Sequence, residues 1–353
     1  MLNLSTSNSR QQAQSYAAHV AKALGGALLL LLLFELVAYF GFHERPLERL
    51  DFGYAQDSGF QLQGDGKIML QRVAFRGLWQ QDYPLKKQPG VLRIMLIGDS
   101  VFRGASYEDS LAGSLRQEMQ NCGIAAEVWS LASPGYGSRR KAILVDKALS
   151  FDPDLLIYHA NITTEYEDAR EWQRKQQHRS WHPSLWLEKL PFIGRLILSK
   201  TEKVYWKWLP EAVRAAVDTP ITETEQALRS KEDTAYWMPT MLTHLTETLQ
   251  QIQQAHVPLL VLTRTSVVAP SGAMTDYGLD DAVAALSPHY GHFVTVSSRK
   301  IFTGVEPHLY FSDNAHWTSQ GHQRVATALL PNVLALLANK YPSLPTCRIS
   351  LEN

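Results

Sequence analysis

The sequence predicts an α/β protein: a three-layer α/β/α sandwich around a five-stranded parallel sheet, preceded by a transmembrane helix. Three observations support this. The apolar run 91–97 stops at Gly98-Asp99-Ser100, which is typical of a buried parallel strand. Further strand-like runs alternate with helical patterns, and this alternation predicts parallel pairing with right-handed crossovers. A long apolar stretch, 23–42, lies near the N-terminus.

Composition indicates a globular protein with a large core. The chain has 353 residues, of which 45% are hydrophobic and 19% charged. Lys+Arg and Asp+Glu are equal at 34 each, so overall charge gives no argument for a nucleic-acid partner.

The N-terminal stretch is predicted to be a membrane anchor. Residues 1–22 form a polar tail, and 23–42 carry one charge, Glu35. Such a helix spans roughly the 30 Å of a bilayer core. A cleaved signal peptide is the alternative, but small residues suited to cleavage are lacking. We expect a cytoplasmic N-terminus and an extracytoplasmic main domain. Glu35 either reaches the outer interface or pairs with a membrane partner.

The catalytic domain is expected at 91–338, between a lead-in at 43–90 that is partly β and a C-terminal tail at 339–353. The remaining strands are predicted at 125–131, 154–159, 258–262 and 292–296. Helices are predicted at 111–120, 137–149, 236–254, 279–286 and 319–338.

A long insertion, about 162–235, interrupts this alternation. It holds five of the nine tryptophans, namely Trp172, Trp181, Trp186, Trp206 and Trp208, and five basic residues between 185 and 210. This composition suits a lid, a membrane interface or a protein-docking surface. An ordinary helical subdomain with its own core fits equally well.

Two cysteines, Cys122 and Cys347, are too few for a disulfide framework or a zinc site. They form either one disulfide in an exported domain or two buried thiols. The histidines are scattered, so neither a metal nor a cofactor is predicted.

Ser100 is the candidate nucleophile. It follows the first strand of the sheet at the edge where ligands bind in open α/β sheets. Three other stretches reach that edge: the glycine-rich loop 133–137, Asn161, and the loop 312–317. In the last, Asp313 precedes His316 by three residues. A carboxylate so placed can orient an imidazole that accepts the serine proton.

These four blocks resemble the SGNH/GDSL hydrolase superfamily, which is flavodoxin-like, over residues 91–338. The family's Ser, Gly, Asn and His correspond to Ser100, Gly135, Asn161 and His316. The resemblance implies that Ser100 is the nucleophile, His316 the general base and Asp313 its orienting carboxylate. It also implies an oxyanion hole made by the backbone N–H groups of Ser100 and Gly135 with the Asn161 side chain.

The third block departs from the family pattern. The family has Gly-x-Asn-Asp, whereas this chain has His159-Ala160-Asn161-Ile162. His159 is either a structural residue or a second ionisable group that contacts substrate. His322 is expected to be structural.

Membrane-anchored relatives of this type resemble proteins of bacterial polysaccharide assembly. The resemblance implies an O-acetyl esterase or O-acetyltransferase at the bacterial inner membrane, acting on a polysaccharide or cell-envelope glycan. A multi-pass membrane O-acyltransferase is an expected partner, and Glu35 and the insertion are candidate contacts. The alternatives are a lipid or thioester hydrolase with a membrane-seated lid, and a catalytically silent scaffold.

Overall fold

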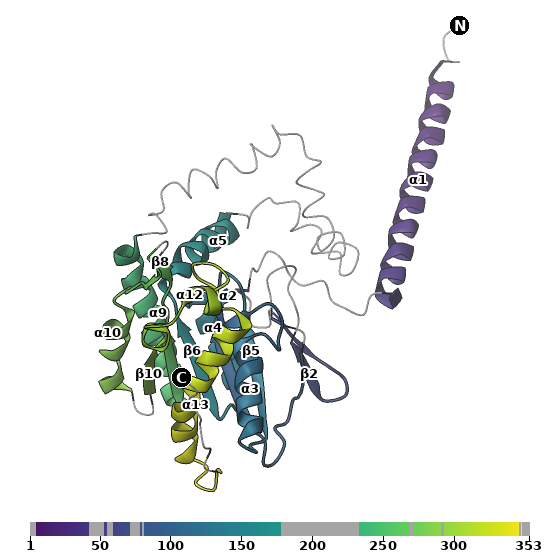
Figure 1. Cartoon of the computed structure of the whole chain (residues 1–353). Coiled ribbons are helices and arrows are strands. Elements are labelled where there is room, and N and C mark those ends of the chain that lie inside the picture. The colour runs from purple at the N-terminus through teal and green to yellow at the C-terminus, as the bar shows by residue number, and fades with distance from the viewer. Residues whose placement is uncertain are drawn as a thin grey trace. The chain divides into compact units, whose positions relative to one another are not determined.

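The computed structural model describes residues 5–41, 53–54, 59–70, 78–79, 81–177, 233–268, 271–290, 293–345 and 347. The chain divides into two units, Met1–Arg49 with Arg179–Glu211, and Leu50–His178 with Ala212–Asn353. The first unit contains α1 (Ser5–Gly41), and the second contains the parallel sheet (Figure 1).

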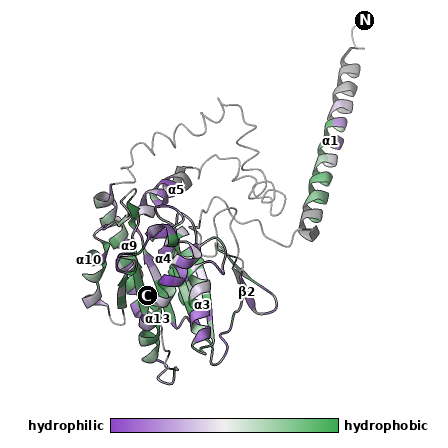
Figure 2. Cartoon of the chain, in the orientation of Figure 1, coloured by the Kyte–Doolittle hydropathy of each residue, from purple (hydrophilic) through white to green (hydrophobic). Residues whose placement is uncertain are grey.

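Helix α1 is long and apolar enough to cross a membrane. The window Ser15–Phe34 has a mean hydropathy of 1.9 and none of it is buried. The hydrophobic turns lie toward the C-terminal half of α1 (Figure 2). Such a helix is consistent with either a membrane anchor or a signal sequence. The side chain of Glu35 lies outside the described residues.

The predicted five-stranded parallel sheet is confirmed. Its strands are β4 (Leu92–Gly98), β5 (Ala126–Ala132), β6 (Leu155–Ala160), β7 (Leu259–Thr263) and β10 (Phe293–Ser297). Their order is β10-β7-β6-β4-β5, and every pairing is parallel (Figure 1). Each strand ends one residue later than predicted, on a small residue that the apolar pattern does not include.

Two hydrophobic cores fill the space on either side of this sheet. In β4, Ile94 and Leu96 belong to one core, while Met95 and Ile97 belong to the other. This alternation follows from the two-residue period of a strand, and it explains why the whole run is apolar. The first core includes α3 (Leu111–Asn121) and α13 (Ser319–Ala338). The second includes α4 (Ser138–Leu149), α9 (Thr234–Gln254) and α10 (Leu279–Ala284).

The loops at the carboxyl ends of the strands contain short elements. These are α2 (Ser100–Arg103), η2 (Ile162–Thr164), β8 (Val267–Val268), β9 (Ala273–Met274), α11 (Ser298–Phe302) and α12 (Pro307–Tyr310). A further short element, η3 (Ser287–His289), lies between α10 and the start of β10. Helix α5 (Glu165–Gln177) starts the expected insertion. The rest of that insertion up to residue 232, with Trp181, Trp186, Trp206 and Trp208, lies outside the described residues.

The lead-in contains an antiparallel sheet of β1 (Phe60–Leu62), β2 (Lys67–Leu70) and β3 (Gln81–Pro84). Tyr83 joins it to the edge strand β5. The Tyr83 ring stacks on Trp129 with centroids 4.4 Å apart, and its hydroxyl donates to the Val128 carbonyl at 2.8 Å. The lead-in therefore packs directly against the parallel sheet.

The C-terminal segment is tied to the domain at two points. Cys122 and Cys347 form a disulfide, with Cα atoms 5.3 Å apart. Lys340 and Tyr341 both donate to the buried carboxylate of Asp154, the lysine at 2.9 Å. Of the two possibilities for the cysteines, the structure shows the disulfide.

Candidate active site

Ser100 lies at the point where β4 ends and α2 begins. Asp99 caps α2, and its carboxylate accepts the Val101 N–H at 3.0 Å. The preceding Gly98 permits this turn, because a Cβ there would lie 2.7 Å from the ring of Phe102. Ser100 is consequently the first residue of a helix, where backbone N–H groups face outward and favour negative charge.

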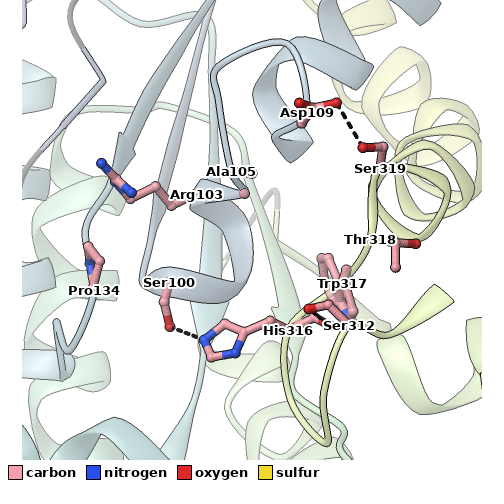
Figure 3. Close-up of a pocket in the computed structure, with 11 residues that line it drawn as sticks. Ser100, Arg103, Ala105, Asp109, Pro134, Ser312, His316, Trp317, Thr318 and Ser319 are labelled. Carbon is pink, nitrogen blue, oxygen red and sulfur yellow. Dashed lines mark hydrogen bonds between the residues drawn. The ribbon is translucent and has the colours of Figure 1, made fainter. Parts of the chain in front are cut away.

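Two consecutive hydrogen-bonding contacts link Ser100 to His316 and His316 to Asp313. Ser100 Oγ lies 2.8 Å from His316 Nε2 (Figure 3), and Nδ1 of that ring lies 2.7 Å from Oδ2 of Asp313. With the Nδ1 proton donated to the carboxylate, Nε2 is the acceptor for the serine proton. The structure thus brings together the three residues predicted to act as nucleophile, base and orienting carboxylate.

Asp313 is held in its ionised form by its own loop. Partial burial works against ionisation, but hydrogen bonds from the His316 backbone N–H, the His316 ring and the Ala315 backbone N–H, each at 2.7 Å, outweigh it. They keep the pKa of the Asp313 carboxyl below its ordinary value. The charge that orients the imidazole is therefore stable to mild acid.

The predicted oxyanion donors lie on the loops that follow the two strands adjacent to β4. Gly135 follows β5 and has a positive φ of 72°. Asn161 follows β6 and is almost fully buried. Its Nδ2 donates to Asp99 at 2.9 Å, and its Oδ1 accepts the Thr163 N–H at 3.0 Å. The amide nitrogen has two hydrogens, so one remains for a ligand.

Asp99, the residue before Ser100, is the centre of a buried polar cluster. Its Oδ2 accepts hydrogen bonds from Lys141 at 3.0 Å and from Asn161 and His159 at 2.9 Å each. Burial alone would raise the pKa of Asp99, but His159 and Lys141 hold it well below its ordinary value. Asp99 is therefore a carboxylate, despite being fully buried.

His159 belongs to this cluster and does not line the cavity at Ser100. Its ring is fully buried and stacks on Phe102 with centroids 4.4 Å apart. Burial lowers its pKa, although Asp99 acts in the opposite direction. Of the two interpretations of His159, the structure supports the structural one. His322 is also buried, with its ring nitrogens facing the carbonyls of Val101 and Asp109.

A cavity of about 380 Å³ opens beside Ser100 and His316 (Figure 3). Its other lining residues are Arg103, Gly104, Ala105, Asp109, Pro134, Ser312, Trp317, Thr318 and Ser319. The predicted oxyanion donors Gly135 and Asn161 are not among them. Arg103 was not expected from the sequence. Its guanidinium lies 3.6 Å from the centre of the Trp79 ring, a cation–π contact.

Sequence reasoning also missed Arg140 and Lys141. Arg140 contacts the backbone of Gly135, and Lys141 contacts Asp99, the residue before Ser100. The available signal was a run of three basic residues, 139–141, one position after the glycine-rich loop. In the described part of the chain, no group of three His, Cys, Asp or Glu residues could hold a metal ion.

Comparison with known proteins identifies similar folds only. No family model and no curated protein matches the chain. The family 3 carbohydrate esterase of Clostridium thermocellum is 12% identical with a TM-score of 0.40, and the match covers 71% of this chain and 98% of that one. The psychrotrophic esterase EstA from Pseudoalteromonas is 10% identical with a TM-score of 0.38, covering 70% and 98%.

AlinE4, an SGNH-hydrolase family esterase, is 16% identical with a TM-score of 0.33, covering 70% of this chain and 98% of that one. The chain is thus an α/β protein with structural similarity, at low identity, to SGNH and GDSL-type hydrolases. Likeness at this level carries no argument about the reaction, the substrate or the role of any residue.

Proposed function

We propose that this chain is a serine-dependent O-acetyl esterase or O-acetyltransferase that acts on a polysaccharide or cell-envelope glycan outside the cytoplasm. The observation that carries the proposal is the 2.8 Å contact between Ser100 Oγ and His316 Nε2, with Asp313 on the other ring nitrogen. A serine, a base and a carboxylate in this relation perform acyl transfer on several unrelated folds.

The first half of the reaction forms an acyl-enzyme. Ser100 Oγ attacks the ester carbonyl carbon while its proton passes to His316 Nε2. The carbonyl oxygen becomes an oxyanion, for which the backbone N–H groups of Ser100 and Gly135 and the Asn161 amide are the donors. The intermediate collapses when the carbon–oxygen bond to the alcohol breaks, and His316 returns the proton to that alcohol.

The second half of the reaction distinguishes the two forms of the proposal. His316 removes a proton from the incoming hydroxyl, whose oxygen attacks the acyl carbon. The bond from that carbon to Ser100 Oγ then breaks, and His316 returns the proton to Oγ. Water as the acceptor gives hydrolysis, and a sugar hydroxyl gives transfer to a glycan. A cavity of about 380 Å³ is near the lower end of the usual range for small-molecule sites, which favours a small acyl group.

The location outside the cytoplasm is supported by two features. Disulfides such as Cys122–Cys347 persist mainly in oxidising compartments. Helix α1 contains an apolar window of 20 residues near the N-terminus, as an inner-membrane anchor requires. A multi-pass membrane O-acyltransferase as partner, and Glu35 and the insertion as its contacts, remain part of this proposal.

The test uses the full chain in detergent with p-nitrophenyl acetate and p-nitrophenyl octanoate, with and without a soluble glycan acceptor. We expect acetate cleavage that falls by about 10⁶-fold in Ser100→Ala and is unchanged in Ser150→Ala, a serine exposed at the end of α4. Acetylated glycan among the products identifies transfer.

Other outcomes identify the alternatives. Preference for the octanoate ester would support a lipid or thioester hydrolase instead. A folded wild-type protein with no Ser100-dependent cleavage of either ester would contradict the enzyme proposal and favour a silent scaffold.

A further inference from the structure

Two consecutive basic side chains near the start of α4 are buried. Arg140 is 0% and Lys141 1% exposed. Such residues are seldom fully buried without partners. A positive charge in the first turn of a helix is also unfavourable, because the N-terminal end of the helix dipole is positive. Both residues therefore depend on specific partners, and those partners lead to the candidate oxyanion donors.

Arg140 fixes the loop that carries Gly135. Its guanidinium donates to the carbonyl oxygen of Gly135 and pairs with Glu171. Its Nε also lies 2.9 Å from Oδ1 of Asp168. Both carboxylates belong to α5. The guanidinium therefore joins α5 to the loop that carries Gly135. The Gly135 carbonyl shares its peptide plane with the Tyr136 N–H, which donates to the Ser133 carbonyl oxygen at 3.3 Å and closes a turn around Pro134 and Gly135. By holding this carbonyl, Arg140 holds the turn that sets the direction of the Gly135 N–H.

Lys141 acts on the other two donors through Asp99. Its Nζ lies 3.0 Å from Asp99 Oδ2 and 2.9 Å from the His159 carbonyl oxygen. Together with His159, the ammonium group holds the pKa of the fully buried Asp99 carboxyl well below its ordinary value. The charged carboxylate then accepts the Val101 N–H, next to Ser100, and the Asn161 amide. Hydrogen bonds to a carboxylate are stronger than those to a neutral acceptor.

We propose that Arg140 and Lys141 are positioning residues that preorganise the oxyanion hole: Arg140 sets the Gly135 donor, and Lys141 sets the Ser100 and Asn161 donors through Asp99. Neither side chain lines the cavity, and both are engaged by the buried partners described above. The inference rests on the proposed acyl-transfer function. It follows from the general rule that oxyanion donors accelerate the reaction only when they are already aimed at the developing charge.

The experiment measures kcat and KM for p-nitrophenyl acetate with the full chain in detergent. In Arg140→Lys the positive charge remains, but the fork that joins Gly135 to α5 is lost. We expect kcat to fall about 10- to 100-fold, a part of the loss caused by removing one donor outright. We expect KM to change less than about twofold, since an interaction made only in the transition state is affected.

Arg139→Lys is the matched control. Arg139 is the neighbouring residue on the same helix, and it lies over the Trp172 ring at 4.6 Å. Its kcat should match that of the wild type. Phenylboronic acid, which forms a tetrahedral adduct with a serine nucleophile, should bind Arg140→Lys more weakly by the same factor as kcat falls. A merely structural role for Arg140 would leave that affinity unchanged per folded molecule.

Lys141 is tested with the pair Lys141→Met and Lys141→Met/Asp99→Asn. The single variant leaves a buried carboxylate without its main cation, which can prevent folding. The double variant removes both charges and retains an acceptor for the Val101 N–H. We expect it to fold, with kcat lowered about 10- to 100-fold.

The outcomes separate the two levels of inference. One outcome is that the wild type is active and that kcat is unchanged in both Arg140→Lys and the folded double variant. This result would overturn the positioning role, while the proposed function would stand. A rise in KM at constant kcat would overturn the positioning role too. No Ser100-dependent cleavage by the wild type would overturn the proposed function and the positioning role together.

Discussion

Asp313 holds His316 through both of its carboxylate oxygens. Oδ2 lies 2.7 Å from the ring nitrogen Nδ1, and Oδ1 accepts the His316 backbone N–H at 2.7 Å. The first contact selects the tautomer of the ring, and the second fixes the loop from which the ring projects. One side chain thus sets both the protonation pattern and the position of the base.

Asp313→Asn separates these two effects. The asparagine carbonyl can still accept the backbone N–H, but its NH₂ group then faces Nδ1 and favours the wrong tautomer. We expect kcat to fall about 10²- to 10⁴-fold with little change in thermal stability. The measurement is steady-state kinetics with p-nitrophenyl acetate beside a melting curve. Wild-type kcat in this variant would show that Asp313 does not orient the base.

Glu165 predicts a dependence of stability on pH. Burial, with the charge of Asp168 adding to it, raises the pKa of Glu165 from 4.5 to about 7. The folded protein therefore binds this proton more tightly than the unfolded chain. Its contribution to stability is complete below the unfolded pKa and is lost as pH rises through about 7.

Glu165→Gln tests this dependence because the amide resembles the protonated carboxyl. We expect the stability advantage of the variant over wild type to grow between pH 5 and pH 8. Denaturant titrations of both proteins at each pH measure that difference, and other titrating groups cancel in it. A difference that stays constant with pH would contradict the assignment.

The Cys122–Cys347 disulfide predicts a loss of stability on reduction. The two residues are 225 positions apart, and closing a loop of this size restricts the unfolded chain strongly. Reduction, or the double variant Cys122→Ser/Cys347→Ser, is expected to lower the free energy of unfolding by about 2–5 kcal/mol. The double variant should be insensitive to reductant, which serves as the control. Two titratable thiols in the denatured, unreduced protein would refute the disulfide.

Gly104 predicts a steric constraint beside the cavity. It has a φ of 65°, and a Cβ there would lie 2.3 Å from the Asp109 carbonyl oxygen. Gly104→Ala is expected to destabilise the protein by about 2 kcal/mol or more. Gly64→Ala is the control, because no atom lies within 4 Å of the added Cβ. Equal unfolding midpoints for the two variants would show that the loop at Gly104 yields easily.

The fold could be predicted because its signals are local. The three central strands of the sheet are buried on both faces, so in β4 Ile94, Met95, Leu96 and Ile97 give a continuous apolar run. Each of the four sequence blocks follows a strand of the sheet. Because the carboxyl ends of parallel strands meet at one edge, the sequence correctly placed Ser100 at that edge.

The supporting contacts of the site could not be predicted, because they depend on tertiary packing. Arg140 and Lys141 have the same sequence pattern as a solvated helix face, and only the packing of α5 and β4 around them shows that they are buried. The two interpretations of His159 likewise differ only in where the side chain points. Arg103 lines the cavity, and its contact with Trp79 from the lead-in is likewise a tertiary contact that the sequence does not show.

The order of the elements also has a consequence for synthesis. The nucleophile is at the start of the sheet, whereas its base is 216 residues later, just before α13. At a translation rate of roughly 5–20 residues per second, Ser100 leaves the ribosome roughly 10 to 40 s before His316. A nascent chain therefore contains the serine without the histidine that activates it. Under the proposed function, ester cleavage requires the loop that carries His316, so chains that end before this loop are inactive.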